Sequence, residues 1–295
     1  MSRRPRAACN HLALLLAGLS ACIPRSIPLT AQPDAVAATR PAALDTTDFA
    51  LVLRRAARPD GVDYAAIAGD LAPLDRFLVR LAAVGPTRTP DLFRQREDRL
   101  AYWINAYNAA ILRIIAAECR PDRLPSRLWP SPEHSVAFVI DGLRRTPAAL
   151  RRVALRDAGD EWRVRLALCG GRRGDPPLAD RPFVPDLLDI QLARQAHAAL
   201  AAPQVVSIDH TSQRLRLGRE LFEWRDRLVA DYEARTGAAD AAVLNALLDL
   251  SPAARRFELN TAIGYRVELL PFDADVNHPG EPPPRGLFSR LLPAW

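Results

Sequence analysis

One stretch of the chain combines a cysteine, paired glycines and paired arginines in a pattern that could carry out nucleophilic chemistry. It reads LALCGGRRGDPPL and covers residues 166–178. Glycine has no Cβ, so the backbone amides of Gly170 and Gly171 could come close to a ligand or steady a developing oxyanion. The Arg172 guanidinium could lower the pKa of the Cys169 thiol or hold an anion. The pattern is compatible with attack by Cys169 on a peptide or acyl bond.

A cysteine nucleophile needs a base within hydrogen-bond reach of its sulfur. His134 and His278 each lie at the edge of a predicted strand, and we take His134 as the candidate catalytic base. The alternative interpretation is structural, because a free cysteine is among the most buried residue types and usually acts as a small core hydrophobe. We favour the structural interpretation of Cys169.

Two side-chain amides inside an apolar helix form a second candidate site. Residues 99–117, RLAYWINAYNAAILRIIAA, predict a buried helix, yet it carries Asn105 and Asn108. At 100° per residue these amides share a face with Tyr102, next to Trp103. Leaving a buried amide unpaired costs about 1–3 kcal/mol. The amides are therefore expected to hold a loop, position a catalytic group or bind a ligand, and we expect this helix to meet the glycine loop at a cleft.

A short acidic run near the carboxyl end is a third candidate. Asp273, Asp275 and Asn277 alternate along an extended segment. This spacing could bind Ca²⁺ or orient a histidine, but such a run at the end of a strand more often makes a turn. The histidines are scattered, and no C-x-x-C or H-x-x-x-H spacing occurs. We predict no metal and no cofactor, and keep Asp273 as a candidate binding residue.

The elements that must position these residues are helices first, then strands mixed with helices. This order predicts an α+β fold in which N-terminal helices precede a small mixed or antiparallel sheet with flanking helices, in a single domain over residues 45–278. Helices are expected within 45–61, 72–84, 90–117, 146–156, 187–202, 220–235 and 238–250, and strands within 134–142, 161–171, 204–209, 213–218 and 264–277.

The first residues predict export and lipid anchoring. Arginines precede an apolar run from Leu12 to Leu19, which is too short to span a membrane and ends in small residues before Cys22. This pattern resembles the lipobox of bacterial lipoproteins, with a signal peptide at residues 1–21 and acylation of Cys22; the alternative is an ordinary signal peptide. The residue after the cysteine, Ile23, favours the periplasmic face of the outer membrane. Residues 22–44 are rich in Pro and Ala and predict an exposed tether.

The charge pattern argues against nucleic-acid binding. All 40 basic residues are Arg, against 34 acidic ones, and removing the signal peptide lowers the formal net charge from +6 to +3. The arginines are interspersed with Asp and Glu instead of forming one stripe. The expected partners are the membrane, through the anchor, and an unidentified envelope protein or small molecule. A Pro-rich tail is expected over residues 279–295.

Five segments occur in the order found in the domain-of-unknown-function family 547, whose bacterial members are often secreted or lipid-anchored. They are GVDYAAIAGD with LDRFLVRLAAV, REDRLAYWINAYNAAIL, RVRLALCGGRRGDPPL, LFEWRDRLVADY and IGYRVELLPFDADVN, spanning about residues 60–277. The chain departs from typical members, which resemble ALNCGSRSCPPL at the glycine loop. Gly174 and Asp175 stand where a second cysteine is expected, and TPAALRRVALR lacks the Glu-His of a helix resembling LDDIEHxILR.

Together these features predict an envelope lipoprotein with a non-catalytic binding or scaffold role. The expected binding site is a cleft between the asparagine helix and the Cys-Gly-Gly loop. The alternative is a cysteine hydrolase or transferase that acts on peptide or acyl bonds through Cys169.

Overall fold

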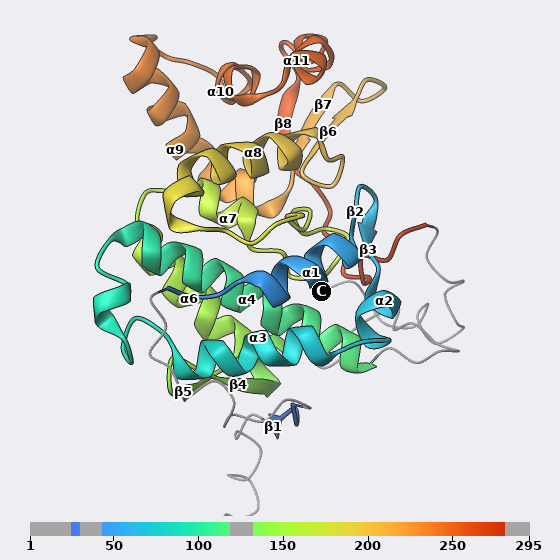
Figure 1. The fold of residues 1–295 in the computed structure, drawn as a ribbon. Coiled ribbons are helices and arrows are strands. Elements are labelled where there is room, and N and C mark those ends of the chain that lie inside the picture. Colours follow the sequence, from blue (N-terminus) through green and yellow to red (C-terminus); the bar gives the residue numbers. More distant parts are fainter. Residues whose placement is uncertain (1–24, 30–42, 119–131, 281–295) are drawn as a thin grey trace, which may run out of the picture.

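The computed structural model describes residues 25–29, 43–118 and 132–280. The predicted signal peptide, the predicted lipid attachment site Cys22 and the tail from residue 281 lie outside these described residues. The fold is α+β, as predicted (Figure 1). No helix among the described residues is both long enough and apolar enough to cross a membrane.

The lower half of the molecule in Figure 1 is a group of helices around α4. Every residue of α4 from Leu100 to Ala116 is buried, including both asparagines, so this helix lies inside the core instead of presenting one face to water. The helices of this half are α1 (Thr47–Ala56), α2 (Tyr64–Ala68), α3 (Ala72–Ala83), α4 (Arg96–Glu118), α5 (Pro132–Ser135) and α6 (Pro147–Ala158).

The upper half contains the remaining helices, packed around a second apolar cluster. Between the two halves runs the loop that follows α7. The helices of this half are α7 (Arg163–Ala167), α8 (Leu188–Ala201), α9 (Arg219–Thr236), α10 (Val243–Leu250) and α11 (Ala253–Asn260), and short 3₁₀ turns occur at Pro90–Leu92 and Pro185–Leu187.

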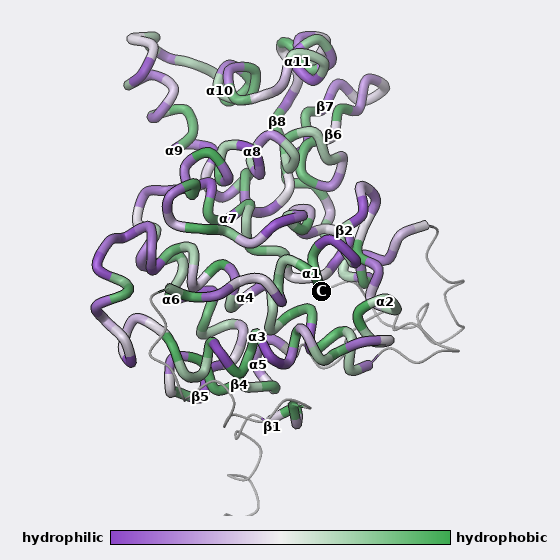
Figure 2. Tube along the Cα trace, in the orientation of Figure 1, coloured by the Kyte–Doolittle hydropathy of each residue, from purple (hydrophilic) through white to green (hydrophobic). Residues whose placement is uncertain are grey.

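The strands form three small sheets instead of the one sheet expected. In the first, β4 is apolar throughout (Figure 2) and pairs in parallel with β1 and antiparallel with β5. The second is the hairpin of β2 and β3, and the third has the order β6-β7-β8, with β7 and β8 parallel. The strands are β1 (Arg25–Ser26), β2 (Ala57–Arg58), β3 (Gly61–Val62), β4 (Val136–Ile140), β5 (Leu143–Arg145), β6 (Val206–Asp209), β7 (Arg214–Leu217) and β8 (Arg266–Leu269).

The strand predicted over residues 161–171 is wrong, because residues 163–167 form the helix α7. The alternating apolar residues come from a short helix that is buried on two sides. Trp162 and Leu166, four positions apart, pack into the upper cluster, whereas Val164 and Ala167, three positions apart, pack into the lower one. A helical turn between two cores therefore imitates the period of a strand.

The predicted exposed tether is partly docked on the body. Arg25 and Ser26 form β1, which pairs with β4. The carbonyl of Pro28 accepts a hydrogen bond from the Arg113 guanidinium at 3.1 Å, and Ile27 packs against the lower cluster. A Pro-rich composition predicts extended backbone but does not show whether that backbone lies on a surface.

Candidate functional site

The two buried asparagines of α4 hold the two ends of the long loop after α7. The Asn108 amide donates to the Ala167 carbonyl at 2.9 Å and accepts from the Cys169 backbone amide at 3.0 Å. The Asn105 amide donates to the Phe183 carbonyl at 2.7 Å and accepts from the Phe183 amide at 2.9 Å. We call these contacts the amide clamps and residues 168–183 the clamped loop. The asparagine helix and the glycine loop therefore meet, and each amide donates one hydrogen bond to a backbone group and accepts one from a backbone group.

The clamped loop is pressed against α4 at its glycines. Gly171 has φ +82°, and a Cβ there would lie 2.3 Å from Cδ1 of Ile115 on α4. A Cβ at Gly170 would lie 2.5 Å from Oδ2 of Asp175. These glycines thus allow close packing of protein groups, and neither of them lines a described cavity.

The other side of the loop pairs with the segment that follows β8. The backbone amides of Arg173 and Gly174 donate to the carbonyls of Asp275 and Asp273 at 2.8 and 2.9 Å. Only residues 266–269 of the predicted last strand are β8, because the chain then leaves the sheet to run along this loop. The backbone amide of Asp275 donates to the Asp273 carboxylate, as in a turn.

Cys169 is a protonated core thiol. It is 2% exposed, and its sulfur lies 3.8 Å from Nδ2 of Asn277. Burial, followed by the negative charge of Asp175, raises the pKa of the thiol to about 12. The candidate base His134 is exposed, and no hydrogen bond joins it to Cys169 in the part of the chain that the structure describes. The geometry gives no support to the cysteine-hydrolase alternative.

We expect Cys169 to react slowly with electrophiles in the folded protein. A pKa near 12 instead of 9.0 leaves roughly 1000-fold less thiolate at neutral pH. Alkylation of Cys169, followed by peptide mass spectrometry, should be fast only after unfolding, and its rate should keep rising above pH 9. Fast labelling of the folded protein at neutral pH would contradict this expectation. The control is Cys169→Ser, in which the label on the peptide that contains residue 169 should be absent.

Tyr102 and Trp103 attach α4 to its neighbours. The Tyr102 hydroxyl donates to the Leu81 carbonyl of α3 at 2.6 Å, and the Trp103 indole donates to the Asp157 carboxylate of α6 at 3.1 Å. Burial raises the pKa of Tyr102 well above its usual value. These two side chains and the clamp asparagines, all predicted as binding residues, are buried and line none of the described cavities.

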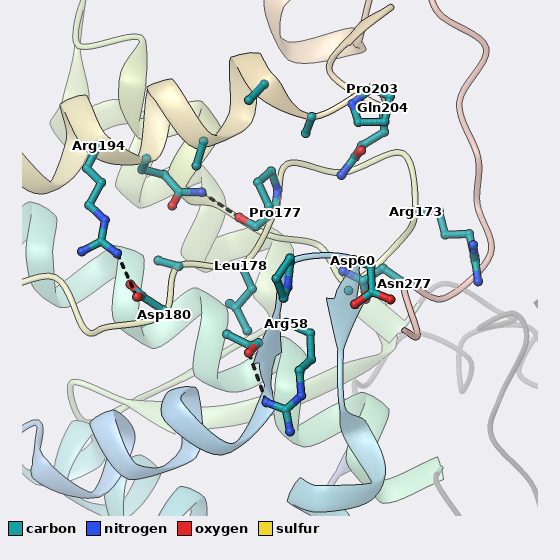
Figure 3. Close-up of a pocket in the computed structure, with 18 of the residues that line it drawn as sticks. Arg58, Asp60, Arg173, Pro177, Leu178, Asp180, Arg194, Pro203, Gln204 and Asn277 are labelled. Carbon is teal, nitrogen blue, oxygen red and sulfur yellow. Dashed lines mark hydrogen bonds and ion pairs between the residues drawn. The ribbon is translucent and has the colours of Figure 1, made fainter. Parts of the chain in front are cut away.

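The largest described cavity borders the clamped loop, and no residue of α4 lines it. It has a volume of about 1170 Å³ and is bounded by the β2–β3 hairpin, the clamped loop, α8 and residues 270–277. Figure 3 shows Pro177 and Leu178 of the clamped loop between α8 and the hairpin. We call this cavity the α8 cleft. Asp273 is the one predicted binding residue that lines it.

The α8 cleft combines exposed apolar side chains with arginines. Ile190 of α8 is 67% exposed, although the apolar face of this helix packs inward. Arg194 pairs with Asp180 at 2.9 Å across one end of the cleft (Figure 3). At the other end, the buried Nε of Arg173 has no hydrogen-bond partner. The lining includes Arg58, Arg173, Arg181 and Arg194 against Asp60, Asp180 and Asp273.

Residues 92–198 match the model of a family described as "Protein of unknown function, DUF547". The match covers 107 of the 295 residues. No curated protein and no solved structure matches the chain. The DUF547 segment is shorter than the predicted span of about 60–277, and it contains both amide clamps and the complete clamped loop.

A second cavity opens on the DUF547 segment, with a volume of about 520 Å³. We call it the Tyr107 pocket, because Tyr107 of α4 contributes to its lining. The predicted residues His134 and Arg172 lie here. Arg172 pairs with Glu133 at 2.7 Å, and Arg151 pairs with Glu220 at 2.5 Å. The sequence pattern did not indicate this pocket because its charged residues come from four separate segments.

Neither cavity offers an arrangement for a metal ion. Within the described residues, no group of three or more His, Cys, Asp or Glu side chains could hold one. Asn277, part of the acidic run, instead accepts a hydrogen bond from the Tyr64 hydroxyl at 2.7 Å.

Proposed function

We propose that this protein is a lipid-anchored protein of the bacterial cell envelope that binds an apolar molecule carrying an anionic group in the α8 cleft. The observation that carries this proposal is the cleft itself, which is of the size that binds small molecules. We assign no reaction to this cleft. The thiol that would be the nucleophile lies buried and protonated on the inner side of the clamped loop.

The chemistry of the cleft supports this class of ligand. Leu187 and Ile190 expose apolar surface that a ligand would remove from water. The buried and unpartnered Nε of Arg173 offers a donor to an anionic group. The amide clamps hold the clamped loop, which forms one wall of the cleft, and a preformed wall lowers the entropy cost of binding.

We expect an apolar anionic dye, 1-anilinonaphthalene-8-sulfonate, to bind to the α8 cleft. Ala198 is an exposed α8 residue that lines the cleft, so Ala198→Trp should fill it and weaken dye binding by roughly 10-fold or more. Fluorescence titration measures both affinities.

The matched control is His197→Trp, because His197 is also exposed on α8 but lines none of the described cavities. It should bind the dye like the wild type. Equal dye binding by Ala198→Trp and the wild type would count against the cleft as the site.

Lipid anchoring is supported by the lipobox-like sequence and by the docking of the segment that follows it. Arg25 of β1 comes three positions after Cys22. Because an extended chain spans at most about 3.6 Å per residue, an acylated Cys22 would keep β1 within roughly 11 Å of the lipid headgroups. The β1–β4–β5 sheet, with exposed Val139 and Leu143, would then face the membrane.

Metabolic labelling tests the anchor. A palmitate analogue should label the wild type, and Cys22→Ala should lose the label and leave the membrane fraction. Cys169→Ala, which keeps the lipobox, should remain labelled. Equal labelling of wild type and Cys22→Ala would refute the anchor without bearing on the α8 cleft.

A further inference from the structure

The Tyr107 pocket is lined by a tyrosine whose hydroxyl has no hydrogen-bond partner among the described residues. Tyr107 is 2% exposed and lines the pocket, yet no hydrogen bond joins its hydroxyl to any residue within the described ranges. Tyr102, one and a half turns earlier on α4, donates to a backbone carbonyl at 2.6 Å. The Tyr107 hydroxyl is not among the fully buried unpaired atoms of the described residues, so it is accessible from the pocket. The open hydroxyl of Tyr107 indicates a place for a group from outside the chain.

Asp175 provides a second unused group in the same pocket. Its Oδ2 accepts the Arg172 backbone amide at 2.9 Å, and no ion pair to Asp175 occurs among the residues that the structure covers. The neighbouring carboxylates are already neutralised: Glu133 pairs with Arg172, and Glu220 pairs with Arg151 and Arg165. Among the described residues, Asp175 is thus the inner carboxyl of this pocket that forms no ion pair with a guanidinium.

The pKa values of Asp175 and Tyr107 are both raised in this pocket. Burial raises the pKa of Asp175 to about 6, with smaller raising effects from Glu133 and Glu220, while Arg172 acts in the opposite direction. Burial also raises the pKa of Tyr107, and the charges of Glu133 and Asp175 add to this effect. A cationic group placed beside Asp175 would compensate the cost of its buried charge.

The outer part of the pocket has the opposite character. Arg152 and Arg219 are exposed and line it, and neither forms an ion pair among the described residues; Arg219 lies over the Phe272 ring at 4.8 Å. An exposed acid, Glu223, also lines this rim. The whole lining balances Arg151, Arg152, Arg172 and Arg219 against Glu133, Asp175, Glu220 and Glu223, so it favours a ligand without net charge.

We propose that the Tyr107 pocket binds a small zwitterion, an α-amino acid or a molecule that ends as one. Its ammonium group lies between Asp175 and Tyr107, and its carboxylate meets Arg152 and Arg219. The apolar side chain of the ligand packs on the remaining walls, which are formed by Leu155, Leu166, Leu168, Val205 and Leu221. This site is independent of the α8 cleft and of lipid anchoring.

Calorimetric titration of the full chain with L-leucine and L-alanine tests the assignment. Two matched probes each lack one charge of leucine: 4-methylpentanoate lacks the ammonium group, and 3-methylbutylamine lacks the carboxylate. Each should bind roughly 10- to 100-fold more weakly than leucine, because a charge-assisted hydrogen bond is lost. Asp175→Asn should weaken leucine binding by a similar factor, and the wild-type affinity should fall below pH 6 as Asp175 gains its proton.

Three results would overturn the proposal: no saturable binding of either amino acid up to about 10 mM, equal affinity for the amine alone, or wild-type affinity in Asp175→Asn. A stability comparison separates binding from folding. Tyr107→Phe should keep the wild-type melting temperature and weaken leucine binding, whereas Tyr102→Phe should lower the melting temperature and keep the leucine affinity. Equal destabilisation by the two variants would mean that the Tyr107 hydroxyl serves the fold, which contradicts the proposal.

Discussion

Asn108→Leu is expected to lower the free energy of unfolding by about 2–6 kcal/mol, because it leaves two buried backbone groups without partners at about 1–3 kcal/mol each. These groups are the Ala167 carbonyl and the Cys169 amide, which Asn108 holds at 2.9 and 3.0 Å. Leucine has a similar size, so the loss reports hydrogen bonding more than packing. Urea unfolding, followed by circular dichroism, measures the change.

Asn245→Leu is the control for this prediction. Asn245 is exposed and accepts a single hydrogen bond, from the Ala242 amide at the start of α10. Its replacement should cost no more than about 1 kcal/mol, as for other caps. If both variants lose the same small amount of stability, the Asn108 amide is not a buried clamp.

Asp75→Ala should lower the free energy of unfolding by about 3–5 kcal/mol, because it leaves the Arg113 charge buried without its carboxylate. The two side chains are 0% and 5% exposed and lie 2.5 Å apart, joining α3 to α4. Arg113 also holds Pro28, so the variant should loosen the docked segment 25–29. Thermal unfolding and proteolysis of the amino-terminal segment measure the two effects.

The exposed pair Asp70–Arg55 provides the comparison. Its side chains are close to half exposed, and their separation is 2.9 Å. Asp70→Ala should therefore change stability by only about 0–1 kcal/mol. A loss of that small size for Asp75→Ala would show that the buried pair does not couple α3 and α4.

The sequence predicted that Asn105 and Asn108 contact buried groups, but it did not decide whether these contacts hold a loop or bind a ligand. Two amides in an apolar helix required buried partners, and the glycine loop was the expected one; Asn108 does bind on both sides of Leu168. The partner of Asn105, Phe183, has no local signal, because a loop conformation decides which distant backbone group arrives. Local sequence patterns predict helices and strands, but they do not predict contacts such as these, which join residues more than 50 positions apart.

One feature of the sequence could have indicated the α8 cleft. The apolar face of α8 includes Leu188, Leu192, Ala196 and Ala199, at helical spacing, and Ile190 lies off this face. An isoleucine outside the buried face could have indicated exposed apolar surface. The rest of the cleft comes from the β2–β3 hairpin, the clamped loop and residues 270–277, which tertiary packing brings together.

The amide clamps hold the clamped loop against α4, so that this loop forms a fixed wall of the α8 cleft. Amide hydrogen exchange at Cys169 and Phe183, resolved by NMR, tests it most directly because both amides donate to clamp oxygens. The account predicts protection near that of the core of α4, with exchange requiring global unfolding. Exchange as fast as that of an exposed loop amide would contradict it.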